Sequence, residues 1–237
     1  MEKYIYIAND MRNRILKGEF ASNDQLPFEK DLIEEYSASK MTVKKALDIL
    51  VNEGLIIKRR GSGTFVKSLS ESELKKRVVS NQFRGTTALN IGKTVESKVL
   101  EFSVIEANKE VSEKLHIEKG SFVYDIYRAR YIDKEPLVME QMYMPIDLIV
   151  GLKKENVKGS IYEFIEEELK LKIKSSHRTI YVRGANETEA KYLEIEEGSP
   201  VAVAEQIAFL DTGEAFEFST SVHRSDKFSI EVILSKD

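Results

Sequence analysis

The chain has 237 residues, of which 42% are hydrophobic and 32% charged, and its formal net charge is −4. This composition is typical of a globular protein that buries a core, and the length accommodates two domains. The absence of cysteine excludes disulfides, thiolate metal sites and cysteine nucleophiles. The sequence shows neither a signal peptide nor an apolar run of the roughly 20 residues that a membrane span requires, so we expect a cytoplasmic protein.

The charge is unevenly distributed along the chain. Residues 1–70 contain 12 Lys and Arg against 10 Asp and Glu, so the remainder is the acidic part. Six cations gather within residues 40–60, namely Lys40, Lys44, Lys45, Lys58, Arg59 and Arg60. Such a cluster provides a face that attracts a polyanion such as DNA, although an ordinary solvated helix face has the same composition.

Three helices are predicted near the N-terminus. Apolar residues recur at helical spacing over residues 3–17, and a second, shorter helix is predicted for Glu29–Tyr36. A third helix begins after Ser39, whose hydroxyl can cap it, and ends at Gly54. Its buried face consists of Val43, Ala46, Leu47 and Leu50.

Two short strands follow the third helix. They are predicted for Leu55–Lys58 and Thr64–Val66, and the glycines of the intervening residues 59–63 allow a tight hairpin. The order helix, helix, short turn, helix and basic hairpin is that of a winged helix-turn-helix, which binds DNA. We assign this domain to residues 1–68 and a polar linker to residues 69–80.

Residues 81–237 alternate strands with helices, which predicts an α+β domain built mainly from antiparallel strands. Hairpin turns are expected at residues 133–135 and 211–213. The expected helices are Lys109–Leu115, Ile161–Leu169 and Glu187–Leu193. The expected strands are Ser97–Glu106, Phe122–Ile132, Leu137–Tyr143, Arg178–Arg183, Val201–Leu210, Ala215–Val222 and Phe228–Leu234.

One segment of this domain is repeated. Residues 107–133 align without gaps on residues 185–211, with nine of 27 positions identical, and each copy predicts a helix, a glycine turn and a long strand. A single repeated pair is too short for a solenoid and favours a two-lobed domain formed by duplication. Such a domain can hold a ligand between its halves, although a repeated packing motif without a pocket is the alternative.

The motifs of both domains resemble a known family. The ordered motifs Leu26-Pro27-Phe28-Glu29, residues 39–47 (SKMTVKKAL), Glu53-Gly54-Leu55-Ile56 and residues 59–66 (RRGSGTFV) resemble the GntR-family DNA-binding domain. Residues 127–131 (YRARY), 135–136 (EP), 160–162 (SIY) and 223–228 (HRSDKF) resemble the UTRA effector domain of the HutC subgroup, which has a chorismate-lyase-like fold. The resemblance implies a transcription regulator, and sugar-phosphate-responsive repressors are the most similar members.

The resemblance implies that the third helix enters the major groove of double-stranded operator DNA and that the glycine hairpin contacts the phosphates and the minor groove. Lysine at positions 40 and 44, where the family more often has arginine, cannot make the two-bond fork to guanine. Phe28 stands where a serine usually caps the second helix. The predicted DNA-binding residues are Lys30, Ser39, Lys40, Thr42, Lys44, Arg60, Gly61, Gly63 and Thr64. A homodimer on a palindromic operator is expected.

Arg128 and Arg130 are two residues apart on a predicted strand and therefore share a face. Two guanidiniums on one face favour an anion such as phosphate between them. Pairing with carboxylates such as Glu140 and Glu217 is the alternative, and both can hold if the carboxylates orient the arginines in the empty site. With the residues that the resemblance adds, the predicted effector site comprises Thr86, Thr87, Arg128, Arg130, Glu140, Ser160, Tyr162, Glu217 and His223. His223 replaces a tyrosine common in the family, so the identity of the effector stays open.

Two other functions are compatible with parts of the sequence. The effector fold is shared with a lyase, but the three histidines are far apart in sequence and no nucleophile motif is present, so we expect no catalytic residue, metal site or cofactor. A regulator with a different effector, such as an amino-acid derivative, a fatty acid or a phosphonate, is the second alternative. The sequence leaves open whether the effector releases DNA or strengthens its binding.

Overall fold

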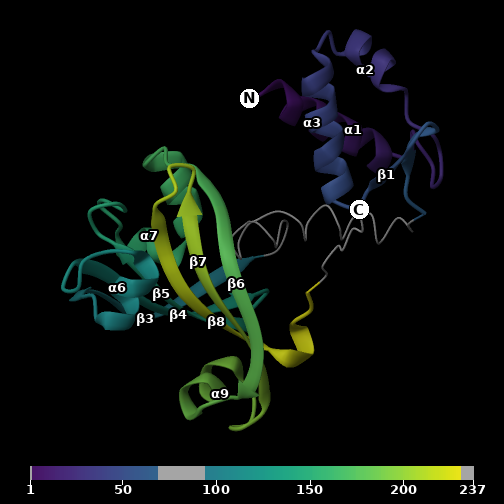
Figure 1. The fold of residues 1–237 in the computed structure, drawn as a ribbon. Helices are drawn as coiled ribbons and strands as arrows, with labels where there is room; N and C mark the ends of the chain where they lie inside the picture. Colours follow the sequence, from purple (N-terminus) through teal and green to yellow (C-terminus); the bar gives the residue numbers. More distant parts are fainter. Residues whose placement is uncertain (1, 69–93, 231–237) are drawn as a thin grey trace. The chain divides into compact units, whose positions relative to one another are not determined.

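The computed structural model describes residues 2–68 and 94–230 (Figure 1). The described residues divide into two compact units, one formed by residues 2–68 with Ile230 and the other by residues 94–229. The predicted linker over residues 69–80 lies outside the described residues, as do Thr86 and Thr87. None of the helices in the described ranges is long and apolar enough to cross a lipid bilayer.

The first unit is a winged helix-turn-helix, as predicted. It consists of α1 (Lys3–Leu16), α2 (Glu29–Glu35), α3 (Lys40–Asn52), β1 (Ile56–Arg59) and β2 (Gly63–Val66). The apolar stripes of the three helices pack on one another, with Met11 of α1, Leu32 of α2 and Leu47 of α3 all fully buried. A buried ion pair adds to this packing, because Arg12 of α1 donates through two nitrogens to the carboxylate of Glu53 just after α3, at 2.8 and 2.5 Å.

The wing is attached to the loop before α2, a contact that the sequence analysis did not predict. The amide of Asn23 donates to the carbonyl of Val66 at 3.0 Å, and the amide of Leu26 donates to the carbonyl of Thr64 at 2.8 Å. The side-chain amide of Gln25 reaches the hairpin tip and donates to the carbonyl of Ser62 at 2.9 Å. The loop therefore acts as a third strand that fixes the wing against the start of α2.

The second unit contains one antiparallel sheet of six strands in the order β3-β4-β5-β8-β7-β6 (Figure 1). Its short helical segments are α6 (Lys109–Leu115), α7 (Lys154–Lys158), α8 (Ile161–Glu163), the π-helical turn η1 (Phe164–Glu168), α9 (Glu187–Leu193) and the 3-10 turn η2 (Ser225–Lys227). Its strands are β3 (Val95–Glu106), β4 (Phe122–Ile132), β5 (Glu135–Pro145), β6 (Ile173–Gly184), β7 (Pro200–Leu210) and β8 (Ala215–Arg224).

The two faces of the sheet are covered differently. On one face, Leu115 of α6 and Leu193 of α9 lie in apolar clusters with the strands. On the other face, the segment of α7, α8 and η1 buries Ile161 and Phe164 against strand residues such as Met142. The alternation of side chains along each strand assigns every second residue to the same face, so a polar residue in an apolar strand marks one face specifically.

The sequence repeat is also a structural repeat. Asn108 caps α6 and Asn186 caps α9, each by accepting the backbone N–H three residues later. In both copies the glycine of the turn, Gly120 or Gly198, has a positive φ and its amide donates to the alanine before the cap. The strand order places the two copies in equivalent positions on either side of the β5–β8 pair. The halves therefore share one continuous sheet, and the predicted two lobes are joined rather than separate.

Three features differ from the sequence predictions. Strand β6 begins at Ile173 rather than Arg178, because an edge strand tolerates the polar run that precedes Arg178. The short helix α7 was not predicted. The predicted strand over Phe228–Leu234 is wrong for residues 228–230, because the turn η2 follows the last strand of the sheet. The ring of Phe228 instead packs on that of His223, with 4.7 Å between the ring centroids. Residues 231–234 lie outside the described residues.

Candidate nucleic-acid interface and effector site

The N-terminal turn of α3 presents the residues predicted to read DNA. The hydroxyl of Ser39 accepts the amide of Thr42 at 3.1 Å, which confirms Ser39 as the helix cap and fixes the start of α3. Lys40 and Lys44 are exposed, and Thr42 is partly exposed. The opposite side of the helix is buried in the core, so α3 is held firmly while its cationic side faces solvent.

The wing combines an exposed arginine at its tip with a backbone that is constrained at Gly63. Arg60 and Gly61 are exposed at the tip. Gly63 has a φ of +120°, and a Cβ atom there would lie 2.5 Å from the side-chain nitrogen of Gln25, so only glycine fits without displacing the contact to the wing. Thr64 is 8% exposed, so its side chain offers little surface to a partner, while its carbonyl accepts the amide of Leu26.

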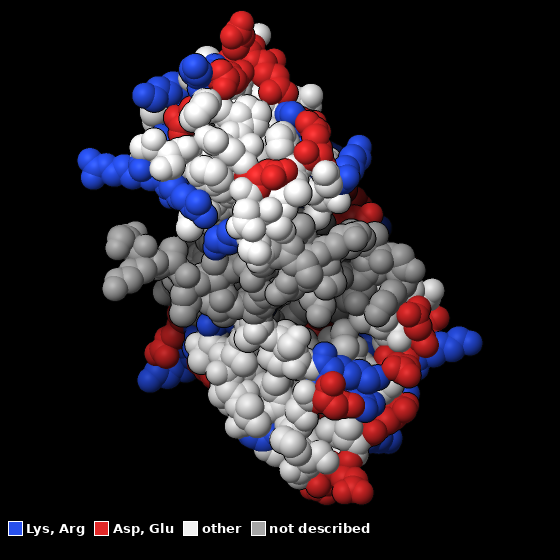
Figure 2. All heavy atoms as spheres, turned by 90° about the vertical axis from the view of Figure 1, so that its right-hand side faces the viewer, with Lys and Arg blue, Asp and Glu red and all other residues white. Residues whose placement is uncertain are grey.

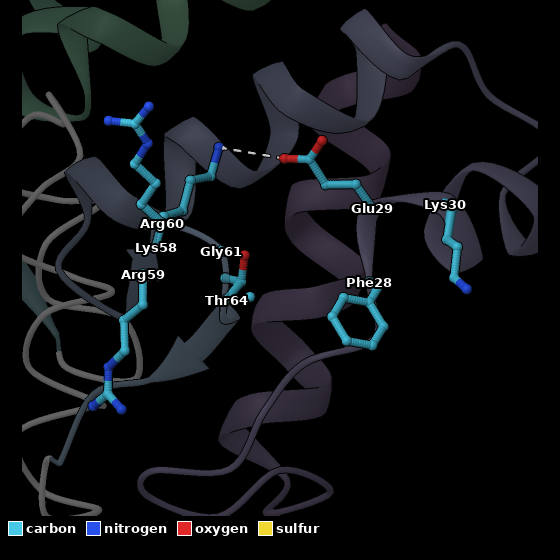
Figure 3. A pocket seen from close by; sticks show the side chains of 9 residues that line it. Phe28, Glu29, Lys30, Lys58, Arg59, Arg60, Gly61 and Thr64 are labelled. Carbon is cyan, nitrogen blue, oxygen red and sulfur yellow. Dashed lines mark ion pairs between the residues drawn. The ribbon is translucent and has the colours of Figure 1, made fainter.

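A groove of about 510 Å³ lies between the wing and the start of α2 (Figure 3). Lys58 in this groove is partly neutralised, because its amine lies 2.7 Å from the carboxylate of Asp48 and 4.0 Å from that of Glu29. Arg59 lies over the ring of Phe65, with 4.5 Å between the guanidinium carbon and the ring centroid. The groove is lined by Phe28, Glu29, Lys30, Lys58, Arg59, Arg60, Gly61, Gly63 and Thr64.

Helix α2 begins at this groove. The amide of Phe28 donates to the carboxylate of Asp31 at 3.1 Å, but the phenyl ring has no acceptor for the N–H groups at the start of the helix. Lys30, also predicted to contact DNA, is exposed. On the face of the molecule that Figure 2 shows, Lys and Arg are interspersed with Asp and Glu, in keeping with the small net charge. The exposed cations predicted to contact DNA lie on α3 (Lys40 and Lys44), at Lys30 and at Arg60 of the wing.

In the second unit, the two predicted arginines share one carboxylate. The Nε atom of Arg128 donates to Glu140 at 2.8 Å, and the guanidinium of Arg130 lies 3.9 Å from the same carboxylate oxygen. Arg128 also donates to the carbonyl of Val157 at 2.5 Å, and both arginines contact the carbonyl of Gly159, at 3.3 and 3.4 Å. All three charged side chains are buried. Both arginines therefore lie beside the carboxylate of Glu140, and this pairing is compatible with an anion site.

Glu217 belongs to a neighbouring polar network rather than to the arginine pair. Its carboxylate accepts the hydroxyl of Ser219 at 2.6 Å and the amide of Gln206 at 3.2 Å. The same amide nitrogen lies 3.2 Å from the hydroxyl of Tyr162, and Arg178 donates to the amide oxygen of Gln206 at 3.0 and 2.5 Å. Burial is the main cause that raises the pKa of the Glu217 carboxyl, and the nearby charge of Glu140 adds to it.

Ser160 and His223 complete the predicted set. Ser160 is the cap of α8, and its hydroxyl accepts the amide of Glu163 at 3.2 Å. Burial lowers the pKa of His223 to about 4, so its ring is neutral at pH 7 although the Glu140 carboxylate is close enough to oppose this effect. Burial likewise lowers the pKa of Arg130, to about 10, so its guanidinium stays charged at neutral pH.

The register of the sheet explains why these residues meet. Arg128 lies opposite Glu140, and Ser219 lies opposite Gln206, so their side chains project from the same face. Gln206, Arg178 and Ser219 were not among the residues predicted for this site from the sequence. The polar residue at position 206 within an apolar strand could have indicated a site residue. Its hydrogen-bond partners, however, can be identified only when the pairing of the strands is known.

The winged helix-turn-helix and the buried polar site in a separate unit define the class of transcription regulators that couple a DNA-binding domain to a sensing domain. Comparison with known families agrees with this class. Residues 3–66 match the model described as "Bacterial regulatory proteins, gntR family", and residues 90–229 match the UTRA domain. The chain belongs to the GntR family of bacterial transcription regulators and carries a UTRA domain.

Similar proteins share this organisation over nearly their whole length. The transcriptional regulator GmuR of Bacillus subtilis is 40% identical over 97% of each chain. The mannosyl-D-glycerate transport/metabolism system repressor MngR of Escherichia coli is 30% identical, over 98% of this chain and 96% of MngR. The crystal structure of the possible regulator YydK from B. subtilis superposes with a TM-score of 0.78 at 30% identity, covering all of both chains. These relatives are regulators, which confirms the interpretation as a regulator rather than an enzyme.

Proposed function

We propose that this chain is a cytoplasmic repressor that binds a palindromic operator as a homodimer and releases it when a sugar phosphate binds the UTRA domain. The observation that supports the effector half is the pair of buried arginines, Arg128 and Arg130, on one sheet face beside the polar network of Gln206, Tyr162 and Glu217. Two adjacent guanidiniums suit an anionic group, which they can bind through paired hydrogen bonds.

The remaining residues of this face suit the uncharged part of the ligand. Gln206, Tyr162 and Glu217 offer both donors and acceptors within a short distance of one another. Sugar hydroxyls need such mixed partners, because each hydroxyl donates one hydrogen bond and accepts others. The relative MngR is named as the repressor of a mannosyl-D-glycerate transport/metabolism system, and this sugar derivative carries a carboxylate, which supports an anionic sugar derivative as the class.

The contacts of Arg128 suggest how the ligand acts on the protein. Its guanidinium is bonded to the carbonyls of Val157 and Gly159, which lie directly before α8. An anion that takes these donors competes with the two carbonyls, so binding shifts the segment of α7 and α8. The effector changes DNA affinity only if it binds one arrangement of the dimer better than the other.

The DNA half rests on α3 and the wing. Lys40 and Lys44 are exposed on the first two turns of α3, and Arg60 is exposed at the tip of the wing. This arrangement suits α3 for the major groove and the wing for the adjacent backbone. A dimer would place two such surfaces on two half-sites related by two-fold symmetry.

The experiment begins with selection of duplexes from a random DNA pool, followed by fluorescence anisotropy with the selected duplex. We expect a palindromic consensus and two chains per duplex. A panel of hexose phosphates, the same sugars without phosphate, and sulfate at matched ionic strength is then added. A hexose phosphate is expected to weaken DNA binding about 5- to 150-fold, the range of typical allosteric coupling.

Matched variants locate the effector site. Arg128→Gln should lose the response to the sugar phosphate, whereas Arg183→Gln, which alters an arginine paired with Glu189 in the same sheet, should keep it. Failure to enrich any sequence would contradict the DNA-binding half. Release by an unphosphorylated or non-sugar compound alone would contradict the effector class while leaving the regulator intact.

A further inference from the structure

Phe28 occupies its position at a cost to the local structure. It is the residue before α2, where an oxygen-bearing side chain normally accepts a free N–H of the helix, and phenylalanine cannot do so. Its ring is nevertheless 51% exposed, so the side chain does not contribute to the core in exchange. The stability of the domain therefore gives no reason for an aromatic residue here.

The surroundings of Phe28 are mainly cationic. The ring lines the groove of about 510 Å³ together with four cations and one carboxylate, that of Glu29, which lies 4.0 Å from the amine of Lys58; the cations are Lys30, Lys58, Arg59 and Arg60. The amine of Lys30 lies 5.8 Å from the ring centroid. Figure 3 shows Phe28 on one side of the groove and the wing residues on the other, with Arg59 and Arg60 leaving the wing in different directions.

The groove has a fixed shape. Gln25 ties the wing tip to the loop before α2, and its side-chain nitrogen donates to the carbonyl of Ser62 at 2.9 Å. A Cβ atom at Gly63 would lie 3.6 Å from the ring of Phe28 and too close to Gln25, so the missing side chain at this position keeps the groove open. The volume falls within the range of pockets that enclose a small molecule or one unit of a polymer.

An apolar ring among cations complements a polyanion that has apolar parts between its charges, and the deoxyribose–phosphate backbone has this character. We propose that the groove between the wing and α2 holds a stretch of one DNA strand, with Phe28 packed on a deoxyribose and with Lys30 and Arg60 on flanking phosphates. This proposal rests on the proposed function, which assigns the wing to the DNA backbone, and adds to it an apolar contact between Phe28 and a sugar of that backbone. The groove would bind DNA independently of base sequence, because it contacts only the sugar and the phosphates.

Salt dependence separates the apolar from the ionic contact. Each phosphate contact contributes a slope of about −0.9 to the dependence of log affinity on log salt concentration. Phe28→Ser should weaken binding about tenfold without a change in this slope, whereas Arg60→Ala should reduce its magnitude by about 1. Serine also supplies the missing cap, so the thermal midpoint of Phe28→Ser should stay the same or rise while DNA affinity falls.

Two further variants and one further measurement complete the test. Phe28→Trp should keep most of the affinity, and Tyr6→Ala, which removes an aromatic ring of similar exposure (55%) from α1, should leave it unchanged. The proposal would be overturned if Phe28→Ser bound DNA with wild-type affinity. It would also be overturned if Phe28→Ser lost the dimer in analytical sedimentation while its DNA affinity stayed unchanged, because the ring would then belong to a contact between protein chains. If the wild-type chain binds no selected duplex, the proposed function itself fails.

Discussion

The shared carboxylate of the arginine pair gives the sharpest prediction for the effector domain. Glu140 lies 2.8 Å from Arg128 and 3.9 Å from Arg130, and its side chain is 8% exposed. Removing one partner of a buried ion pair costs about 3–5 kcal/mol, and glutamine keeps one acceptor, so we expect about 3 kcal/mol for Glu140→Gln. At about 2–4 °C per kcal/mol for a domain of this size, the thermal midpoint falls by roughly 6–12 °C.

An anion should restore this loss. Phosphate that binds only the folded protein stabilises it by about 2.7 kcal/mol at a concentration 100 times its dissociation constant. Because the variant lacks the negative charge between the guanidiniums, inorganic phosphate at fixed ionic strength should raise its thermal midpoint more than that of the wild type. The assay is differential scanning fluorimetry of the full chain.

Glu205→Gln is the matched control. Glu205 lies in the same sheet and its carboxylate is 2.5 Å from the amine of Lys114, but both side chains are about one-third exposed. Exposed pairs contribute about 0–1 kcal/mol, so this variant should lose little stability and gain no response to phosphate. The reasoning is refuted if the two variants are equally stable, or if phosphate shifts Glu140→Gln no more than it shifts the wild type.

Three other changes test the remaining parts of the molecule. Lys44→Ala should weaken operator binding by about 1–3 kcal/mol at an unchanged thermal midpoint, and equal affinity in anisotropy titrations would remove α3 from the interface. The pKa of His223 is lowered to about 4, so the unfolded chain accepts a proton that the folded chain excludes. Stability should therefore fall by up to about 3 kcal/mol between pH 6.5 and pH 4, and urea titrations of His223→Gln should lack this part of the fall. Glu53→Ala should destabilise the DNA-binding domain by about 3–5 kcal/mol by leaving Arg12 buried without its carboxylate, whereas Glu19→Ala, at an exposed pair, should unfold like the wild type.

Local signals in the sequence were sufficient for most elements. The predicted bounds of α6, β4 and α9 agree with the structure, because an asparagine cap, a glycine turn and an alternating strand follow one another in each copy of the repeat. The three N-terminal helices were predicted from their apolar spacing and from Gly54. These signals act over a few residues and need no knowledge of the remaining fold.

Contacts between distant segments were not predictable in the same way. Lys58 was counted among six cations, yet it is paired with Asp48 and near Glu29. The clamp from Gln25 to the wing and the network around Gln206 depend on strand register, which a local pattern does not specify. Some residues of the two candidate sites were therefore named from the sequence, but their hydrogen bonds and ion pairs had to come from the structure.

The internal repeat has a consequence for the way in which a ligand lies in the sheet. The alignment of the two copies makes Gln206 the counterpart of Arg128 and Ala208 the counterpart of Arg130. The first copy thus contributes two positive charges to the shared face, and the second contributes an amide and a methyl group. A domain with two identical copies would accept an elongated ligand in either of two directions. Divergence of these two positions gives the proposed effector site a single polarity, so we expect the anionic end of the proposed ligand to point to β4 and its neutral end to β7.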